Sequence, residues 1–297
     1  MRPSKRILLI GQNGQVGWEL RRTLFLLGDI VSTERSNLDL TDMDSIRRCI
    51  RETHPDLIVN AAAYTAVDQA ERESDQAFRI NAEAPGLMAE EAAKTGAILV
   101  HYSTDYIFDG HQDTPVREEE ACAPLNVYGR SKLAGEEAIL ATGARHLIFR
   151  LCWVYGNRGR NFFLTMLRLA KERERLRVVQ DQIGCPTWSR LIAQSTAMAL
   201  QQVIVSRDSE PLLGVYHLCA RGQTSWHGFA KAIVESMPPR GRKCQAVEPI
   251  ATAEYPTAAM RPRYSALATE KFEATFGLRL PAWEDSLSLV MQESAAL

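Results

Sequence analysis

The most specific chemistry in the sequence comes from two side chains four positions apart, Tyr128 and Lys132. They stand in a segment with a helical pattern, where this spacing places both on one face. A neighbouring ammonium group stabilises phenolate and lowers the pKa of a tyrosine toward the working pH. Such a tyrosine can give a proton to a carbonyl oxygen as a hydride arrives at the carbonyl carbon. The pair also arises by chance, so it needs support from other segments.

A glycine-rich turn is the second candidate for chemistry. Gly11, Gly14 and Gly17 follow a short apolar run at 7–10 and open a helical pattern. Glycine permits a tight turn and close approach of a pyrophosphate, and the N–H groups of a helix N-terminus attract that anion. A plain strand-to-helix turn is the alternative, but the strand before and the helix after favour a dinucleotide site. The residues that would line it are Gly11, Asn13, Gly14, Gln15, Val16 and Gly17.

Charges after the second predicted strand leave the choice of dinucleotide open. A dinucleotide fold places an acidic residue about 20 residues after the glycines, and Glu34 stands there, with Asp39 shortly after. Glu34 favours a free 2′-hydroxyl group on the ribose, as in NAD. Arg35 beside it could instead hold a 2′-phosphate, as in NADP. A solvated surface charge is the alternative for each of these residues.

Polar or small residues follow two more predicted strands. Thr104 offers a hydroxyl and Asp105 a carboxylate just beyond the predicted strand at 97–102. Asn60 ends another predicted strand, and the alanines after it would let a ribose lie close. Open α/β sheets bind ligands beyond the carboxyl ends of their strands. We therefore expect these strand ends, the glycine turn and the Tyr128 helix to converge on one crevice.

These side chains need a scaffold, and the rhythm of the chain predicts one. Short apolar runs typical of buried strands alternate with amphipathic helical patterns in the first half. Gly28 is the expected C-cap of the first helix, and Thr41 the expected N-cap of the second. The predicted strands are 7–10, 29–33, 56–60, 97–102 and 146–151, and the predicted helices are 15–27, 43–52, 81–94 and 129–141. Such alternation predicts βαβ units and a parallel sheet covered on both faces.

The rhythm loosens after residue 151. The second half has predicted helices at 161–173, 190–205 and 283–292, strands at 177–180 and 215–218, and a long loop at 249–262. We expect an α/β fold, a Rossmann-like doubly wound parallel sheet with a smaller α/β substrate-binding lobe. The predicted division is a dinucleotide-binding domain at 1–150 and a mainly substrate-binding lobe at 151–297, with some segments returning to the first domain.

Composition excludes several classes of protein. The chain has 297 residues, 45% of them hydrophobic and 24% charged, with a formal net charge of −1. These values are those of a globular protein and exclude disordered, collagenous and coiled-coil chains. Near-neutral charge argues against nucleic acid or an anionic membrane as a partner. A phosphorylated ligand must then be held by local groups.

Cysteine usage and the N-terminus predict a cytoplasmic protein. The six cysteines form no CxxC pair and no metal-ligand spacing, which indicates reduced thiols. The apolar run at 6–10 is too short for a signal peptide or a membrane span. His101 and His217 lie in apolar runs and are expected to be core residues.

Taken together, these motifs resemble those of the dTDP-4-dehydrorhamnose reductase family, within the extended short-chain dehydrogenase/reductase superfamily. The likeness runs from the first strand to the last helix and rests on residues 11–20, 60–63, 101–108, 124–136, 153–155 and 181–187. It implies that NADPH or NADH reduces the C4 ketone of dTDP-6-deoxy-L-lyxo-4-hexulose, the last step of dTDP-L-rhamnose biosynthesis, which supplies carbohydrates such as O-antigen. It also implies a dTDP-sugar as the partner and a monomer or homodimer.

The resemblance assigns a role to each matching residue. Tyr128 would donate the proton, Lys132 would hold the nicotinamide ribose and tune Tyr128, and Thr104 would tune the same hydrogen-bond site. The sugar would be contacted by Thr104, Asp105, Tyr128 and Trp153. The cofactor would be lined by the glycine turn with Glu34, Asp39, Leu40, Ala61, Ala62, Ala63, Tyr64, Thr65, Tyr102, Tyr128 and Lys132.

The chain departs from the family at one site. Dimeric members bridge two subunits through Mg²⁺ held by three glutamates; Glu19 and Glu293 match two of these positions, but Arg190 stands at the third. Mg²⁺ needs hard oxygen ligands, whereas arginine offers only N–H donors. We therefore expect no bridging metal and no dimer built on one. An ion pair between Arg190 and a glutamate could take its place.

Two other hypotheses remain open. The same scaffold serves reductases and epimerases of other nucleotide sugars, and a reductase-like relative serves as a non-catalytic regulatory subunit of methionine adenosyltransferase. An intact set of Thr104, Tyr128 and Lys132 favours an enzyme, because a purely binding protein need not keep it.

Overall fold

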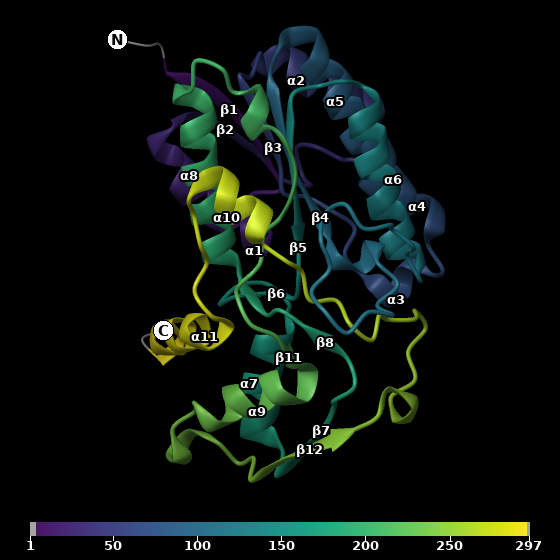
Figure 1. Ribbon diagram of the computed structural model, residues 1–297, viewed down its shortest axis with the longest axis vertical. Coiled ribbons are helices and arrows are strands. Elements are labelled where there is room, and N and C mark those ends of the chain that lie inside the picture. The colour runs from purple at the N-terminus through teal and green to yellow at the C-terminus, as the bar shows by residue number, and fades with distance from the viewer. Residues whose placement is uncertain (1–3, 296–297) are drawn as a thin grey trace.

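Six parallel strands build the central sheet of the computed structural model, which describes residues 4–295 (Figure 1). Their order is β10-β5-β4-β3-β1-β2, so the strand order reverses between β1 and β3, as in a doubly wound sheet. This confirms the predicted fold class. The strands are β1 (Lys5–Ile10), β2 (Gly28–Thr33), β3 (Leu57–Asn60), β4 (Ile98–Thr104), β5 (His146–Leu151) and β10 (Gly214–His217).

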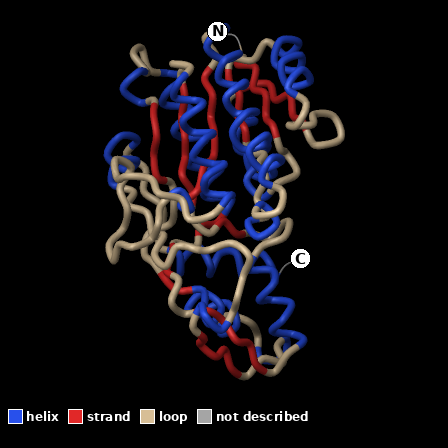
Figure 2. The backbone as a smooth tube through the Cα atoms, turned by 90° about the vertical axis from the view of Figure 1, so that its right-hand side faces the viewer, coloured by secondary structure: helices blue, strands red, loops and turns tan. Residues whose placement is uncertain are grey.

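Helices cover both faces of this sheet, because successive strand side chains point to opposite faces. Ile7 and Leu9 of β1 share a core with one layer of helices, whereas Leu8 and Ile10 share a core with the other. One layer lies in front of the strands in Figure 2. The first layer contains α1 (Gln15–Thr23), α8 (Ser189–Val205) and α10 (Glu270–Phe276), and the second contains α2 (Met43–Thr53), α5 (Ala84–Thr95) and α6 (Val127–Ala141).

A smaller lobe lies beyond the carboxyl end of the sheet, at the lower end of Figure 1. Its core includes the buried aromatic side chains of Phe163, Phe229 and Trp283. Three strand pairs accompany it: β7 with β12, β8 with β11, and β6 with β9. The elements are β6 (Val154–Tyr155), α7 (Phe162–Glu172), β7 (Arg175–Val179), β8 (Ile183–Gly184), β9 (Thr187–Trp188), β11 (Thr224–Ser225), α9 (Trp226–Glu235), β12 (Ala246–Ile250) and α11 (Trp283–Ala295).

Short helical segments connect these elements. Two α-helical pieces and one π-helical turn lead into α5: α3 (Val67–Ala70), α4 (Ser74–Phe78) and η2 (Arg79–Glu83). The 3-10 turns are η1 (Leu24–Leu26), η3 (Asp105–Ile107), η4 (Glu210–Leu212), η5 (Pro239–Gly241) and η6 (Thr252–Glu254). The predicted helix at 81–94 lies inside the helical run of η2 and α5, which ends at Thr95 and is followed by Gly96 in the left-handed conformation.

Both predicted caps in the first half are wrong. The helix predicted to reach residue 27 ends at Thr23, and Gly28 begins β2 instead of capping the helix. A Cβ at Gly28 would lie 2.0 Å from the carbonyl oxygen of Lys5, so glycine is needed for close strand approach. Asp42, not Thr41, caps α2, since its carboxylate accepts hydrogen bonds from the backbone N–H groups of the first turn.

Parts of the second half return to the central sheet. β10, predicted at 215–218, is an edge strand of that sheet, and α8 and α10 cover one face of it. The sequence pattern did not predict α9, β12 or α10, and the loop predicted at 249–262 begins inside β12. The division of roles at residue 150 stays a prediction, and its outermost residues, 1–3 and 296–297, lie outside the described part.

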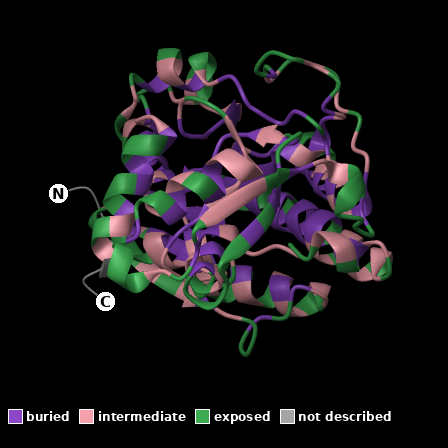
Figure 3. Cartoon of the chain, turned by 90° about the horizontal axis from the view of Figure 1, so that it is seen from below, coloured by how far each residue is buried: buried purple, intermediate pink, exposed green. Residues whose placement is uncertain are grey.

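Buried residues fill the middle of the molecule, and exposed residues lie on the outer helix faces and loops (Figure 3). His101 and His217 are fully buried, as expected for core residues. Within residues 4–295, none of the helices combines the length and the apolar run that a membrane crossing requires.

Candidate active site

The predicted site residues lie where the central strands end. Parallel register pairs Ile10 with both Thr33 and Asn60, so the first three strands of the chain end together. Asn60 pairs in turn with His101, and β4 continues to Thr104. The glycine turn, the alanine segment and the Thr104 segment therefore leave the sheet at the same edge.

Close backbone contacts account for two glycines of the turn. Gly11 has a φ of +87°, in the left-handed region, and a Cβ there would lie 2.8 Å from the backbone nitrogen of Ala62. A Cβ at Gly17 would lie 2.0 Å from the carbonyl oxygen of Gly11. Gly14 is the N-cap of α1 and places no side chain over the first-turn N–H groups. Free N–H groups at a helix end are suited to hold an anion.

Glu34 lies against the glycine turn. The amide of Asn13 donates a hydrogen bond to one carboxylate oxygen of Glu34, and the hydroxyl of Ser36 donates to the other at 2.9 Å. The backbone N–H of Glu34 donates to the amide oxygen of Asn37 at 2.7 Å. The acidic residue predicted to read the ribose is thus fixed beside the turn predicted to hold the pyrophosphate.

Asp39 and Leu40 lie on the loop after β2. The carboxylate of Asp39 accepts hydrogen bonds from the backbone N–H and the hydroxyl of Thr41, both at 2.9 Å. These bonds, with the nearby charges of Arg35 and Arg79, lower the pKa of Asp39. Leu40 is buried in the core between the sheet and the layer of α2, α5 and α6.

The alanine segment is tied to the rest of the site through Asn81. Asn81 is fully buried; its amide oxygen accepts from the backbone N–H of Tyr64 at 2.8 Å, and its amide nitrogen donates to the Ser131 hydroxyl on α6 at 2.9 Å. No motif indicated Asn81, because its partners Tyr64 and Ser131 are 17 and 50 residues away in the chain. Ala61, Ala62 and Ala63 are partly exposed, and Thr65 is exposed.

Thr104 and Asp105 form a buried hydroxyl–carboxyl pair next to Tyr128. The Thr104 hydroxyl donates to Asp105 Oδ1 at 2.9 Å, and burial raises the pKa of Asp105 to about 6. Desolvation also raises the pKa of Tyr128 to about 12, an effect that Asp105 strengthens and a hydrogen bond with Thr104 opposes. Tyr128 therefore carries its proton at neutral pH.

The expectation that Lys132 lowers the pKa of Tyr128 is wrong for this structure, because the amine of Lys132 is engaged elsewhere. Its Nζ donates to the carbonyl oxygen of Tyr102 at 2.7 Å and lies 3.0 Å from Nε2 of His101. Burial lowers the pKa of Lys132 itself to about 8. Tyr102 contacts the site residues through its backbone carbonyl group. Its side chain points elsewhere, because its hydroxyl forms a hydrogen bond with Thr196 on α8 at 2.9 Å.

Trp153 is held in a strained position between the sheet and the smaller lobe. Its φ is +41°, an unfavourable value for a bulky residue, and such strain concentrates at functional sites. Its ring stacks on Trp226 at 3.5 Å between ring centroids. On Gly184, a Cβ would lie 2.4 Å from the same ring, so that position admits only glycine. Trp226 was missed because its partner is distant in the chain.

The loop after β12 is bonded to α3 and to the start of α6. Arg261 forms an ion pair with Asp68 of α3 at 2.6 Å, and the backbone carbonyl of Met260 accepts from the Asn126 amide at 2.7 Å. Asn126 is the N-cap of α6, the helix that carries Tyr128. This loop therefore fixes the start of the helix that carries Tyr128, which sequence spacing alone did not indicate.

The residues at the family's metal position do not fit Mg²⁺. The guanidinium group of Arg190 on α8 lies 3.3 Å from a carboxylate oxygen of Glu19 on α1 and forms a second ion pair with Glu293 on α11. It also lies over the ring of Trp188. Both carboxylates thus already face a cation of the same chain, which joins three helices.

We expect activity and molar mass to be insensitive to metal removal, because Arg190 supplies the positive charge at this position. The measurement is steady-state turnover and light-scattering mass before and after EDTA treatment. Arg190→Glu is the reciprocal variant, since it brings three carboxylates together: its thermal stability should rise with Mg²⁺, unlike that of the unmodified chain. Loss of activity or mass that Mg²⁺ restores in the unmodified chain would contradict the expectation.

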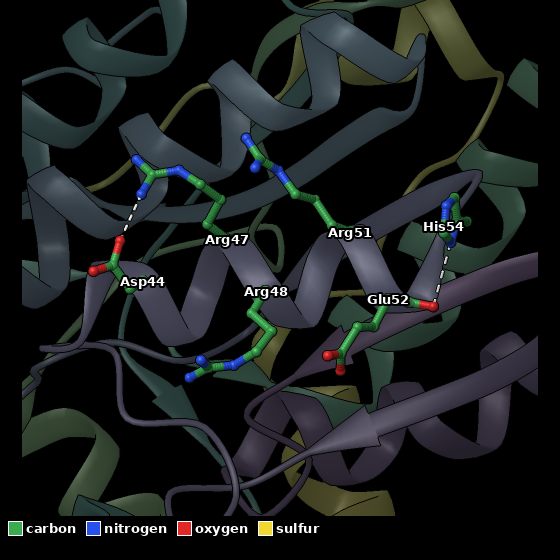
Figure 4. Close-up of a pocket in the computed structure, with 6 residues that line it drawn as sticks. All are labelled: Asp44, Arg47, Arg48, Arg51, Glu52 and His54. Carbon is green, nitrogen blue, oxygen red and sulfur yellow. Dashed lines mark hydrogen bonds and ion pairs between the residues drawn. The ribbon is translucent and has the colours of Figure 1, made fainter.

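A surface hollow on α2 lies apart from these residues (Figure 4). Arg47 and Arg51 in this hollow form ion pairs with the buried carboxylate of Glu91 on α5. Arg51, together with Lys94, lowers the pKa of Glu91 to about 2. The hollow is lined by Asp44, Arg47, Arg48, Arg51, Glu52 and His54, none of them a predicted site residue. The ion pairs of this hollow join α2 to α5, so its charged side chains serve the packing of the fold.

Comparisons with known proteins show similarity along nearly the whole chain. The family model described as "RmlD substrate binding domain" matches residues 5–296. A dTDP-4-dehydrorhamnose reductase from Burkholderia thailandensis is 46% identical over 295 residues, covering 97% of this chain and 98% of the relative. One from Escherichia coli K12 is 44% identical, covering 97% of each. The crystal structure of the Bacillus anthracis dTDP-4-dehydrorhamnose reductase with NADP superposes with a TM-score of 0.88 at 36% identity, covering 98% and 99% of the two chains.

Proposed function

Because the chain belongs to the RmlD substrate binding domain family, with dTDP-4-dehydrorhamnose reductases as its relatives, we propose that it reduces the C4 ketone of dTDP-6-deoxy-L-lyxo-4-hexulose to dTDP-L-rhamnose. The chain is an NAD(P)-dependent oxidoreductase of dTDP-rhamnose biosynthesis. The observation that carries the proposal is that the buried Thr104–Asp105 pair and Tyr128 lie together at the strand edge from which the glycine turn also leaves.

Tyr128 is the proton donor in this proposal. Its pKa of about 12 keeps the phenol protonated at neutral pH, as a general acid requires. The Thr104 hydroxyl, anchored on Asp105 at 2.9 Å, orients the phenol and can approach the same carbonyl oxygen of the sugar. A bound NADPH or NADH supplies the hydride for the sugar carbonyl carbon.

The proposed cofactor residues lie in two groups, one for the adenosine end of the cofactor and one for its nicotinamide end. The first turn of α1 and Glu34 would hold the pyrophosphate and the adenosine ribose, and Lys132 would hold the nicotinamide ribose. Hydrogen bonds that fix Glu34 beside Asn13 support NADH, whereas Arg35 supports NADPH. Asp39, Leu40 and the segment from Ala61 to Thr65 would line the space between them.

Thr104, Asp105 and Trp153 would contact the sugar. The pKa of Asp105, about 6, leaves mainly carboxylate at neutral pH, an acceptor for a sugar hydroxyl. The Trp153 indole offers an apolar face to the deoxysugar and an N–H to a hydroxyl group. Its stacking on Trp226 supports this role, because it fixes the plane of the ring.

We expect Trp153→Ala to raise KM for the sugar nucleotide by an amount equivalent to roughly 1–3 kcal/mol, the range for pocket contacts. The cofactor Kd should hardly move, because the glycine turn and Glu34 lie on the other lobe. KM, cofactor Kd and the free energy of unfolding are measured on the same variant. If Trp153 only packs the core, unfolding free energy falls by about 3–5 kcal/mol while KM stays unchanged.

The direct test is oxidation of NADPH or NADH by the purified chain with the 4-keto sugar nucleotide made in situ. Oxidation with that substrate and none without it supports the proposal. A reductase or epimerase of another nucleotide sugar would reject this substrate, and a regulatory subunit would show no turnover. We also propose that the protein works in the cytoplasm, as a monomer or homodimer, and supplies rhamnose to polymers such as O-antigen.

A further inference from the structure

Two buried polar side chains, Asn60 and His101, form a row with Lys132, and the reaction described above does not use these two residues. Asn60 at the end of β3, His101 in β4 and Lys132 on α6 are each at most 1% exposed. The amide nitrogen of Asn60 lies 3.2 Å from Nδ1 of His101, and Nε2 of His101 lies 3.0 Å from Nζ of Lys132. Buried polar groups need partners, so the protons in this row must be arranged consistently.

The backbone fixes the first proton of the row. The N–H of Ala62 donates to Oδ1 of Asn60 at 3.2 Å, which leaves the Asn60 amide NH₂ facing Nδ1 of His101. Nδ1 must then accept, because a donor facing a donor would leave both without a partner. A neutral imidazole that accepts at Nδ1 carries its proton on Nε2. That N–H points at Nζ of Lys132.

We propose that His101 is a positioning residue for Lys132: held by Asn60 with its proton on Nε2, it donates to Nζ and favours the uncharged amine. The neutral amine has one lone pair to accept from His101 and still donates to the Tyr102 carbonyl oxygen, 2.7 Å away. A charged ammonium has no acceptor site and would face the Nε2–H group. The inference rests on the proposed function only for the role of Lys132 in turnover.

Other charges around the amine are already paired. Glu136, one turn further along α6, favours the charged form of Lys132, but it forms a buried ion pair with Arg150 of β5 at 2.8 Å. Asp105 of η3 shares its hydrogen bond with Thr104. His101 itself stays neutral, because burial holds its pKa well below the usual value. The neutral His101 is therefore the group in direct contact that decides between the two forms of the amine.

The test measures the pKa of Lys132 in the free protein by NMR of the lysine ¹³Cε–¹Hε groups between pH 6 and 10. The sequence has seven lysines, and the resonance lost in Lys132→Met identifies Lys132. His101→Gln can turn an amide oxygen toward Nζ, and Asn60→Asp can accept a proton from Nδ1 and so move the histidine proton. We expect both substitutions to raise the Lys132 midpoint by about one pH unit, a tenfold change in proton affinity.

His217→Gln is the matched control, because His217 is an equally buried histidine in β10 that does not contact Lys132. Its Lys132 midpoint should match that of the unmodified protein. The ionisation of Lys132 in the pH profile of kcat should move with the NMR midpoint in His101→Gln, while KM stays near the original value.

An unchanged or lowered midpoint in the folded variants overturns the proposal, since His101 would then be inert or would accept from an ammonium. Asn60→Asp keeps the test intact if His101→Gln fails to fold. The NMR midpoints need no sugar substrate. A shifted midpoint in a chain without reductase activity would therefore reject the proposed function and leave this inference standing.

Discussion

Replacing Tyr128 by phenylalanine should lower turnover by about 10²-fold or more, the usual scale for the loss of a general acid. The change removes one hydroxyl group and keeps the ring, which packs edge-on against Tyr106 with ring centroids 6.0 Å apart. The fold and cofactor binding should stay nearly intact. The measurement is kcat with the sugar nucleotide, together with cofactor Kd and thermal unfolding.

Tyr216→Phe is the control for this experiment. Tyr216 is a buried tyrosine on β10 whose hydroxyl donates to the carbonyl oxygen of Leu212 at 3.1 Å. The Tyr216→Phe variant also loses one phenolic hydroxyl group, but away from the proposed site. Its kcat should therefore stay near that of the unmodified protein. Near-normal turnover of Tyr128→Phe would remove Tyr128 from the mechanism.

Gly17→Ala should weaken cofactor binding by about 10²-fold, equivalent to about 3 kcal/mol. The new Cβ would lie 2.0 Å from the carbonyl oxygen of Gly11, and neither backbone segment can yield without moving the start of α1. The N–H groups that would hold the pyrophosphate then shift away from it. Fluorescence titration with NADPH and NADH measures the effect.

Two other glycines calibrate this result. Gly241→Ala has open space around the new methyl group and should bind cofactor normally. At Gly14 the new Cβ would lie 3.4 Å from the carbonyl oxygen of Gly11, so Gly14→Ala should fold normally. It should weaken cofactor binding only because the methyl group crowds the pyrophosphate. Unchanged affinity in Gly17→Ala would contradict the placement of the cofactor on this turn.

The sequence predicted the parts of the fold that depend on local pattern. Continuous apolar runs such as 7–10 coincide with strands, since a parallel strand buried on both faces has no polar alternation. Helix ends were less certain because several residues can cap. Asp42 took the place of Thr41 at α2, since Thr41 bonds Asp39 instead. The membership of β10 in the central sheet depends on pairing with β5, which no local pattern encodes.

In the candidate site, too, local motifs were predicted and long-range contacts were not. Motif spacing predicted that Thr104, Tyr128 and the glycine turn belong together, and the structure places them at one sheet edge. Asn81 and Trp226 act through partners distant in the chain, so spacing could not reveal them. The direction of the Tyr128 pKa was wrong because it depends on desolvation and on where the Lys132 amine points.

The most direct test of the central claim follows the hydride. The purified chain is given the 4-keto sugar nucleotide made in situ and NADPH or NADH carrying two deuterium atoms at C4 of the nicotinamide. We predict dTDP-L-rhamnose with one deuterium at C4 of the sugar, formed in step with cofactor oxidation. A product without deuterium at C4, or an unchanged ketone with no cofactor oxidised, would contradict the account.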